Sequence, residues 1–587
     1  MARHNPSCQA PDTAAVYGIV IMFLASAVVG GELFAESPTA ASESNERIER
    51  VRPADVIDRS SDLLRYREFS SKLAREFEPG SAEPRASELP TVTEVADGFV
   101  IRMDTGSPVS TPTVFDGRLF VSGGFNSTEF HCFDAKHGKH IWTVDLSDDG
   151  PSIAAIDDGV LTISTESCTL FALDAKTGKH LWSFYLGDPL LSSPAIANGR
   201  VFAVYPLPET DDPAQAEGPD AEPRPETKTE GVQQPDTDSP TAVPTHAIVC
   251  FELRSGKILW QHALDTDCIT APVVSADEVF VVTMSGLLYR FSQKDGSAVT
   301  AHDLQATTPP VISGKSMYVS RRISTPDGQG VREMVAHCDL LGRPIQGSVL
   351  AWSAPHLDRA IQELSKFTKH ATEIEAANGI GGGFGGGFFQ VTEKPGGSQT
   401  PDDGEGNAAS GTSVSDPQEF PDLLARTQNI AADLIGLGNV ATLQCYQGSR
   451  PLLWSDRCFS CIGSKVICFS ANNSELIWEQ ALNGDVREIG GHLGTPPVPA
   501  GEWLFVATVS GDVLQIAPTD GSIARRYDAG AEVRFAPTVM DGRIYVGTQA
   551  GEVRCIRTDN PHITGWSGWG GDPAHSNVCR WAAPWHK

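Results

Sequence analysis

One motif recurs along this chain with a fixed offset between a glycine and a tryptophan. It reads FDAKHGKHIW, LDAKTGKHLW and FELRSGKILW, and a related copy reads FSANNSELIW. Trp142 and Trp182 lie 40 residues apart, as do Trp260 and Thr300, which stands at the tryptophan position of a weaker copy. A repeat of this length indicates one supersecondary unit copied along the chain, and not several unrelated domains.

Each period also predicts β-hairpins. It opens with a small residue and a proline, followed by alternating apolar residues around a tight turn, as in SSPAIANGRVFAV and FAPTVMDGRIYVG. Alternation with period two around Asn-Gly or Asp-Gly is typical of a hairpin. Four short strands fit one period, which is the pattern of a propeller blade. We count eight blades, with starts near Ser107, Asp149, Leu190, Cys268, Ala306, Asn439, Val486 and Ala531.

The two ends of the repeat region are expected to join. The segment DGFVIRMDTG, which begins at Asp97, has the pattern of a lone outer strand. Pairing this strand with the last unit would remove an exposed sheet edge that otherwise invites aggregation. We therefore expect a closed ring.

The repeat resembles the PQQ-like (pyrroloquinoline quinone) repeat family, whose blades carry Ala-x-Asp-x-x-Thr-Gly-x-x-x-Trp. Ala172, Asp174, Thr177, Gly178 and Trp182 match this pattern best. The resemblance implies an all-β, eight-bladed propeller like that of the quinoprotein alcohol dehydrogenases, with each tryptophan docked on a neighbouring blade. We expect the repeated acids to hold turns. The residues to which we assign a structural role in the repeat are Asp134, Gly138, Trp142, Asp174, Gly178, Trp182, Gly256, Trp260, Trp478 and Gly521.

The segments outside the repeat have distinct compositions. Residues 1–35 contain an apolar run from Ala14 to Gly31 and read as a signal peptide or a signal anchor. Residues 36–94 read as a linker with an amphipathic helix over 53–77, ahead of a propeller over 95–578 and a tail over 579–587. Two insertions interrupt the propeller: a disordered Pro-rich acidic one over 208–245, and one over 354–438 with helical, Gly-rich and acidic parts.

Charge and cysteine content limit the partners and sites. A formal net charge of −29 argues against nucleic acid as a partner, because binding phosphates requires clustered Lys and Arg. Cys458 and Cys461 are spaced as two zinc ligands can be, but they have no second pair at matching spacing. A metal site, a disulfide and buried thiols all remain open for them.

Three functions fit the sequence. The first is a non-catalytic scaffold of the cell envelope or periplasm, with or without a single N-terminal membrane anchor, that binds envelope proteins through its propeller loops. This function follows from similarity to the propeller subunit of the outer-membrane β-barrel assembly machinery. The second is a quinoprotein dehydrogenase with pyrroloquinoline quinone and calcium at the axis. The third is a surface propeller that binds a small ligand or a saccharide. We assign no catalytic and no cofactor-binding residue, because the cofactor-binding residues of the dehydrogenases do not map onto this chain.

Overall fold

The structure, a computed structural model, describes residues 89–575 apart from 125–126, 167, 187–191, 208–243, 325–330, 346–348, 354–449 and 486–491, together with parts of residues 47–84. Every described residue belongs to one compact unit, Glu46–Lys587. The expected signal segment, most of the helix over 53–77, the bulk of both insertions and the tail over 579–587 lie outside the described residues. Within the described part, no helix is long and apolar enough to cross a membrane.

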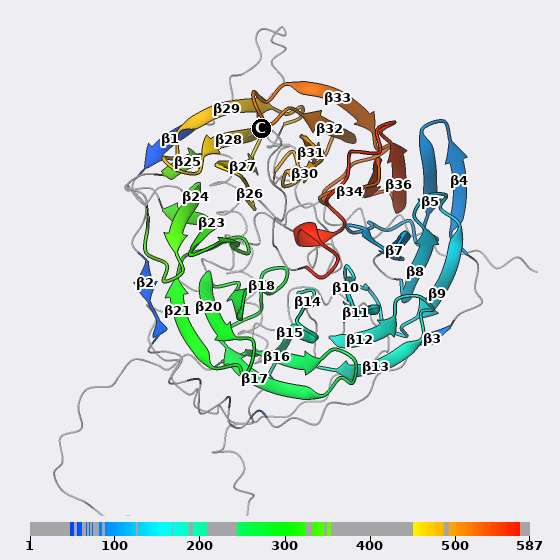
Figure 1. The fold of residues 1–587 in the computed structure, drawn as a ribbon, viewed down its shortest axis with the longest axis horizontal. Helices are drawn as coiled ribbons and strands as arrows, with labels where there is room; N and C mark the ends of the chain where they lie inside the picture. The colour runs from blue at the N-terminus through cyan, green and yellow to red at the C-terminus, as the bar shows by residue number, and fades with distance from the viewer. Residues whose placement is uncertain are drawn as a thin grey trace, which may run out of the picture. The chain divides into compact units, whose positions relative to one another are not determined.

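Eight antiparallel sheets stand around a common axis, which confirms the predicted eight-bladed propeller (Figure 1). The inner strands of successive blades contact each other, as β10 does β14 and β34 does β6. The first four blades consist of β6 (Thr113–Phe115), β7 (Arg118–Ser122), β8 (Glu129–Asp134) and β9 (His140–Asp145); β10 (Ala155–Asp157), β11 (Val160–Ser164), β12 (Thr169–Asp174) and β13 (His180–Tyr185); β14 (Ala195–Ala197), β15 (Arg200–Pro206), β16 (His246–Glu252) and β17 (Ile258–Leu264); and β18 (Val273–Ser275), β19 (Glu278–Val282), β20 (Leu287–Ser292) and β21 (Ala298–Asp303).

Blades 5 to 8 complete the ring. They consist of β22 (Val311–Ser313), β23 (Ser316–Ser324), β24 (Val331–Asp339) and β25 (Val349–Ser353); β26 (Leu452–Trp454), β27 (Arg457–Ile462), β28 (Lys465–Ser470) and β29 (Leu476–Ala481); β30 (Val498–Ala500), β31 (Trp503–Ala507), β32 (Asp512–Ile516) and β33 (Ile523–Asp528); and β34 (Thr538–Met540), β35 (Arg543–Gly547) and β36 (Glu552–Arg557), followed by β5 (Gly98–Arg102) and β4 (Thr91–Val95). The closing strand predicted from Asp97 is therefore confirmed, since β5 pairs with β36.

Tight turns of the predicted kind join the first two strands of several blades. Asp116 and Gly117 have φ values of 48° and 70°, and Asn198 and Gly199 have 50° and 69°. Two successive positive φ values define the hairpin turn whose twist matches that of the strands. This local geometry is why Asp-Gly or Asn-Gly marks the first hairpin of blades 1, 2, 3 and 8.

The described parts of residues 47–84 lie along the outside of the ring. β1 (Arg47–Val51) pairs with β25, β2 (Ile57–Asp58) with β21 and β3 (Glu83–Pro84) with β9. Between them, the Ser70 Oγ accepts the N–H of Ala263 at 3.1 Å. We call residues 47–84 the strap. The region that the sequence indicated as a linker thus supplies outer strands to blades 5, 4 and 1.

The strand order gives the ring two distinct faces. Turns that join first to second and third to fourth strands lie on one face, which we call the turn face. Loops that join second to third strands, and one blade to the next, lie on the opposite face, which we call the insertion face. Residues 208–243 join β15 to β16, and residues 354–449 join β25 to β26, so both insertions leave from the insertion face. Arg47 pairs with Ser353, the last residue of β25, so the strap also begins on that face.

Candidate functional site: the axis and the insertion face

The glycines and tryptophans of the repeat meet between neighbouring blades. A Cβ on Gly178 would lie 2.8 Å from Cδ2 of Trp142, and one on Gly521 would lie 2.6 Å from Cε3 of Trp478. The glycine of one blade thus lets the tryptophan of the preceding blade lie flat against its backbone. The same contact joins Gly256 to Trp182. Gly138 lies instead against Phe99 of the closing strand, at 2.8 Å from the built Cβ to Cδ2.

Indole N–H groups add a hydrogen bond to this contact. Nε1 of Trp182 donates to the Leu253 carbonyl at 2.9 Å, and Nε1 of Trp260 donates to the Gln293 carbonyl at 3.0 Å. Nε1 of Trp478 donates to Pro518 at 3.0 Å. Trp182, Trp260 and Trp478 therefore both pack and bond between blades, whereas Nε1 of Trp142 is buried without a hydrogen-bond partner among the described residues.

The repeated acids lie at exposed turns on the turn face. Oδ1 of Asp174 accepts the N–H of Thr177 at 2.8 Å and its hydroxyl at 2.7 Å. Oδ1 of Asp134 accepts the N–H of His137 at 2.7 Å. These side chains satisfy turn donors in the manner of Asx turns. Their hydrogen bonds hold the turn that positions the next outer strand.

The axis is crossed by the segment that follows the last blade, an arrangement the sequence did not reveal. η1 (Trp569–Gly571) lies at the centre of the ring (Figure 1). Trp569 is completely buried, and Arg450 of the loop before β26 lies over its ring at 5.3 Å from the centroid. His575 meets the Trp569 ring edge to face at 5.4 Å between centroids, and its Nδ1 donates to the Pro194 carbonyl at 2.8 Å. The stretch Trp566-Ser-Gly-Trp569 is visible in the sequence, but nothing in its pattern places it on the axis.

Among the described residues, the axial segment brings Trp569 and His575 together with Arg450 but forms no cluster of metal-binding side chains. Burial lowers the pKa of His575 to about 4, so the imidazole is neutral at pH 7. Calcium requires several carboxylate or carbonyl oxygens, whereas the described residues hold no cluster of three or more His, Cys, Asp or Glu side chains that could bind a metal. Arg450 and Trp569 are the kinds of groups that contact a quinone, but they are already packed against each other.

The structure does not bring Cys458 and Cys461 together as ligands. Both lie on β27 three residues apart, so their side chains point to opposite faces of the strand. Cys461 lies in the core shared with blade 7, and Cys458 lies in the core shared with blade 5. Burial raises the pKa of the Cys461 thiol to about 12 and that of Cys458 well above its usual value. Both are packed as apolar groups.

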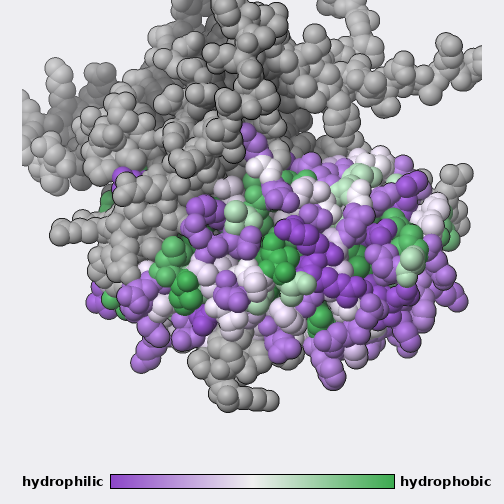
Figure 2. Space-filling view, turned by 90° about the horizontal axis from the view of Figure 1, so that it is seen from above, coloured by the Kyte–Doolittle hydropathy of each residue, from purple (hydrophilic) through white to green (hydrophobic). Residues whose placement is uncertain are grey.

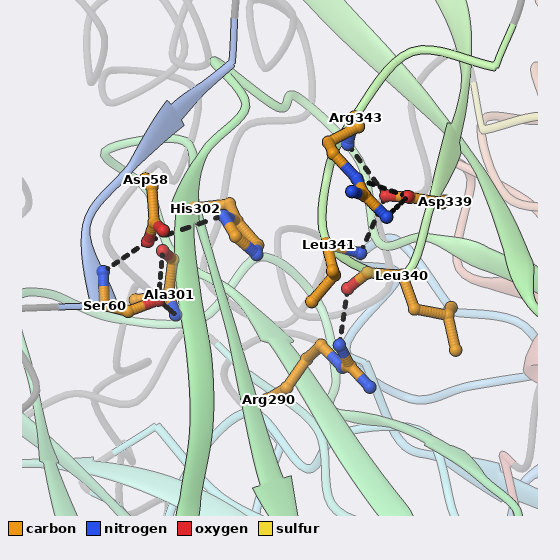
Figure 3. A network of polar contacts seen from close by, with 9 residues as sticks. All are labelled: Asp58, Ser60, Arg290, Ala301, His302, Asp339, Leu340, Leu341 and Arg343. Carbon is orange, nitrogen blue, oxygen red and sulfur yellow. Dashed lines mark hydrogen bonds and ion pairs between the residues drawn. The ribbon is translucent and has the colours of Figure 1, made fainter.

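Outside the axis, one group of polar contacts joins the strap to blade 4 and a second group joins blade 4 to blade 5 (Figure 3). Oδ1 of Asp58 accepts the N–H of Ser60 at 2.8 Å and lies 4.0 Å from Nδ1 of His302. Nη1 of Arg290 donates to the Leu340 carbonyl at 2.6 Å, in the turn that Asp339 and Arg343 close by an ion pair of 2.7 Å. Burial is the main cause that lowers the pKa of His302. Apart from the His302 ring, which forms no hydrogen bond among the described residues, these groups bond to one another and to backbone, so the contacts are structural.

An acidic group that the sequence analysis did not single out lies on the insertion face between blades 1 and 2. Asp148 and Asp149 follow β9, and Glu166 follows β11, where its N–H donates to the Asp149 carbonyl at 2.8 Å. Burial, then the charges of Asp149 and Asp148, raise the pKa of Glu166. The hydroxyl of Thr165 donates to Asp148. The run Ser-Asp-Asp-Gly at 147–150 was the available sequence indication.

The rim of the described ring is mostly polar. Figure 2 shows hydrophilic side chains over most of this side and apolar ones in small separate groups. Among the exposed apolar residues are those directly before the repeat tryptophans, such as Ile141, Leu181 and Ile477, each 42% exposed. Single exposed apolar side chains of this kind are ordinary on soluble proteins. The rim seen in this view therefore presents no large apolar patch.

Comparison with known proteins gives a family match over most of the repeat region. The family model described as "Outer membrane protein assembly factor BamB" matches residues 126–216, 228–359 and 453–569. No curated protein matches the chain. BamB from Moraxella catarrhalis is 14% identical, over 80% of this chain and 100% of its own, with a TM-score of 0.44. A quinohemoprotein alcohol dehydrogenase from Pseudomonas putida is 12% identical, over 79% of this chain and 76% of its own, with a TM-score of 0.42.

Saccharomyces cerevisiae Sqt1 is 9% identical, over 81% of this chain and 100% of its own, with a TM-score of 0.45. At these scores and identities, neither this similarity nor the two above bears on function. The family model is different, because its three segments together span more than half of the chain and coincide with the blades. This chain belongs to the family of the outer membrane protein assembly factor BamB.

Proposed function

We propose that the chain is a non-catalytic scaffold of the cell envelope that binds proteins of outer-membrane assembly through the loops of its insertion face. The observation that carries this proposal is topological. Both long insertions and the start of the strap belong to the same face of the ring. Function in a propeller resides in the loops that the rigid sheets hold in place.

The two faces differ in what they offer a partner. On the turn face, short turns repeat with acids that bond to their own backbone, as at Asp134 and Asp174. On the insertion face, loops differ in length from blade to blade and carry the acidic group around Asp149. Variable loops on a fixed frame suit the recognition of a particular protein.

The family supports the choice of partner class. Its description names outer-membrane protein assembly, and the proposal extends that role to this chain. The filled axis, with Trp569 packed between Arg450 and His575, favours a scaffold over a cofactor enzyme. We expect neither pyrroloquinoline quinone nor a metal to be needed for function.

Capture of defined partners by the full chain tests the proposal. Purified outer-membrane assembly proteins are passed over the immobilised chain and over two variants, in which residues 208–243 or 354–449 are replaced by a short Gly-Ser turn. We expect saturable binding that at least one deletion weakens. Titration of the same chain with pyrroloquinoline quinone and calcium, with dye-linked alcohol oxidation as readout, is expected to give neither binding nor turnover. Saturable quinone binding with turnover would contradict the scaffold function and support a quinone-dependent dehydrogenase instead.

A further inference from the structure

The inner strand of each blade presents one backbone edge to the axis. In β10, Ile156 is paired with Leu161 in the hairpin but directs its N–H away from β11, where it donates to the Pro573 carbonyl at 2.6 Å. The residue at the same register position does likewise in three other blades. These bonds run from Val539 to Trp566 at 2.6 Å, from Val114 to Ser567 at 2.7 Å and from Ile196 to Ala574 at 2.9 Å.

The axial segment 566–574 thus contacts four consecutive blades in the order in which they follow one another around the ring. It bonds to blade 8, then to blades 1, 2 and 3, and nine residues, 566–574, supply all four acceptors. Next along the chain, His575 is held at blade 3 by its bond to the Pro194 carbonyl. The blades that come next around the ring are 4, 5 and 6.

The same register position in those three blades carries a backbone N–H group that is likewise directed away from the hairpin partner. The residues are Val274, paired with Val279, Ile312, paired with Met317, and Leu453, paired with Cys458. No described residue accepts their N–H groups. Val274 is only 3% exposed, and a buried N–H without a partner costs free energy comparable to a lost hydrogen bond. In blade 7 the position holds Pro499, paired with Leu504, which has no N–H to satisfy.

We propose that the axial edges of blades 4, 5 and 6 form a binding site for an extended polypeptide, and that its occupant is the segment 576–587 of this chain. The segment follows His575 directly, so it starts where the vacant donors start. Its sequence contains Val578, Trp581 and Trp585 with an Ala-Ala pair, which suits an axis already filled by Trp569. Backbone carbonyls of an extended segment are the acceptors that three edge N–H groups require.

Hydrogen exchange at individual amides tests the proposal in the full chain. The amides of Val274, Ile312 and Leu453 are compared between the full chain and a variant that ends after His575. We expect each to exchange at least about tenfold faster in the truncated variant, since a hydrogen bond of ordinary strength slows exchange by that order. The amides of Val114 and Ile156 serve as matched controls and are expected to keep their rates. Addition of a synthetic peptide of residues 576–587 should restore the slow rates.

Two results would overturn the proposal. One is fast exchange of the three amides in the full chain, and the other is equal protection in both forms, which would assign the protection to burial alone. A second measurement does not depend on the truncated variant folding. A photo-crosslinking amino acid at position 581 of the full chain is expected to react with β18, β22 or β26, whereas crosslinks only to the rim or between molecules would contradict the assignment.

Discussion

Replacing Gly178 by alanine tests the contact between neighbouring blades. Gly178 has a φ of 70°, and a Cβ there would lie 2.8 Å from Cδ2 of Trp142 in the preceding blade. Gly159 in the same blade has a φ of 74°, but a Cβ there would meet nothing within 4 Å. The two glycines therefore share the backbone requirement and differ in the contact with tryptophan.

The expected losses of unfolding free energy follow from this difference. A left-handed backbone costs an L-residue about 1–2 kcal/mol, so Gly159→Ala should lose that amount. Gly178→Ala carries the same cost and in addition forces a methyl group into a packed indole, which costs about 1–3 kcal/mol. We therefore expect Gly178→Ala to be the more destabilising by about 1–3 kcal/mol.

Urea unfolding of both variants, with and without Trp142→Ala, measures the contact. In the Trp142→Ala background the methyl group meets no indole, so the difference between the two glycine variants should largely disappear. Equal losses for Gly159→Ala and Gly178→Ala in the intact chain would refute the assignment of Gly178 to the contact between blades. So would a difference that persists without Trp142.

Three further predictions concern single side chains in the blades. Asp174→Ala should lower the unfolding free energy by about 1 kcal/mol by removing the acceptor for Thr177, and Asp174→Asn, which keeps an acceptor oxygen, should lose less in the same urea assay. Burial lowers the pKa of His131 to about 3 and that of His246 to about 4. Below pH 6.5 the unfolded chain therefore takes up protons that the folded chain does not, and stability should fall on acidification by up to about 1.4 kcal/mol per pH unit for each histidine. His246→Gln should flatten the slope between pH 7 and pH 5, and an unchanged slope would count against a neutral buried His246. Burial raises the pKa of Cys132 and Cys461 to about 12, so both thiols should resist a maleimide at pH 7 in the folded protein and react only in denaturant; labelling of either in native buffer would contradict their burial.

The ring was predictable from the repeat because the strands of each blade can be recognised from the sequence of that blade alone. The hairpin at Asn198-Gly199 and the alternation around it identify two strands without any knowledge of the rest of the chain. The 40-residue distance between Trp142 and Trp182 then gives the period, and the closing strand at Asp97 follows from the same motif. A period of about 40 residues with four short strands in each copy leaves few folds other than a propeller.

The strap and the axial segment could not be predicted in this way. β2 and β3 contain two residues each, and β3 includes Pro84, so neither has a period to detect. Their pairing depends on outer edges that exist only once the ring has formed. The same holds for Trp569, whose burial comes from Arg450 and His575, two residues far from each other in the sequence. Cys458 and Cys461 show the opposite case, in which a ligand-like spacing in the sequence falls on a strand that separates the side chains.

Site-specific photo-crosslinking in intact cells tests the proposed scaffold most directly. A crosslinking amino acid is placed at Ser510 or Ala550, exposed on the insertion face, and at Lys136 or Lys176, exposed on the turn face. We predict that outer-membrane assembly proteins are captured from the insertion-face positions and not from the turn-face positions. Capture from the turn-face positions alone would contradict the account. So would the absence of capture from both faces together with quinone binding and quinone-dependent alcohol oxidation by the same chain.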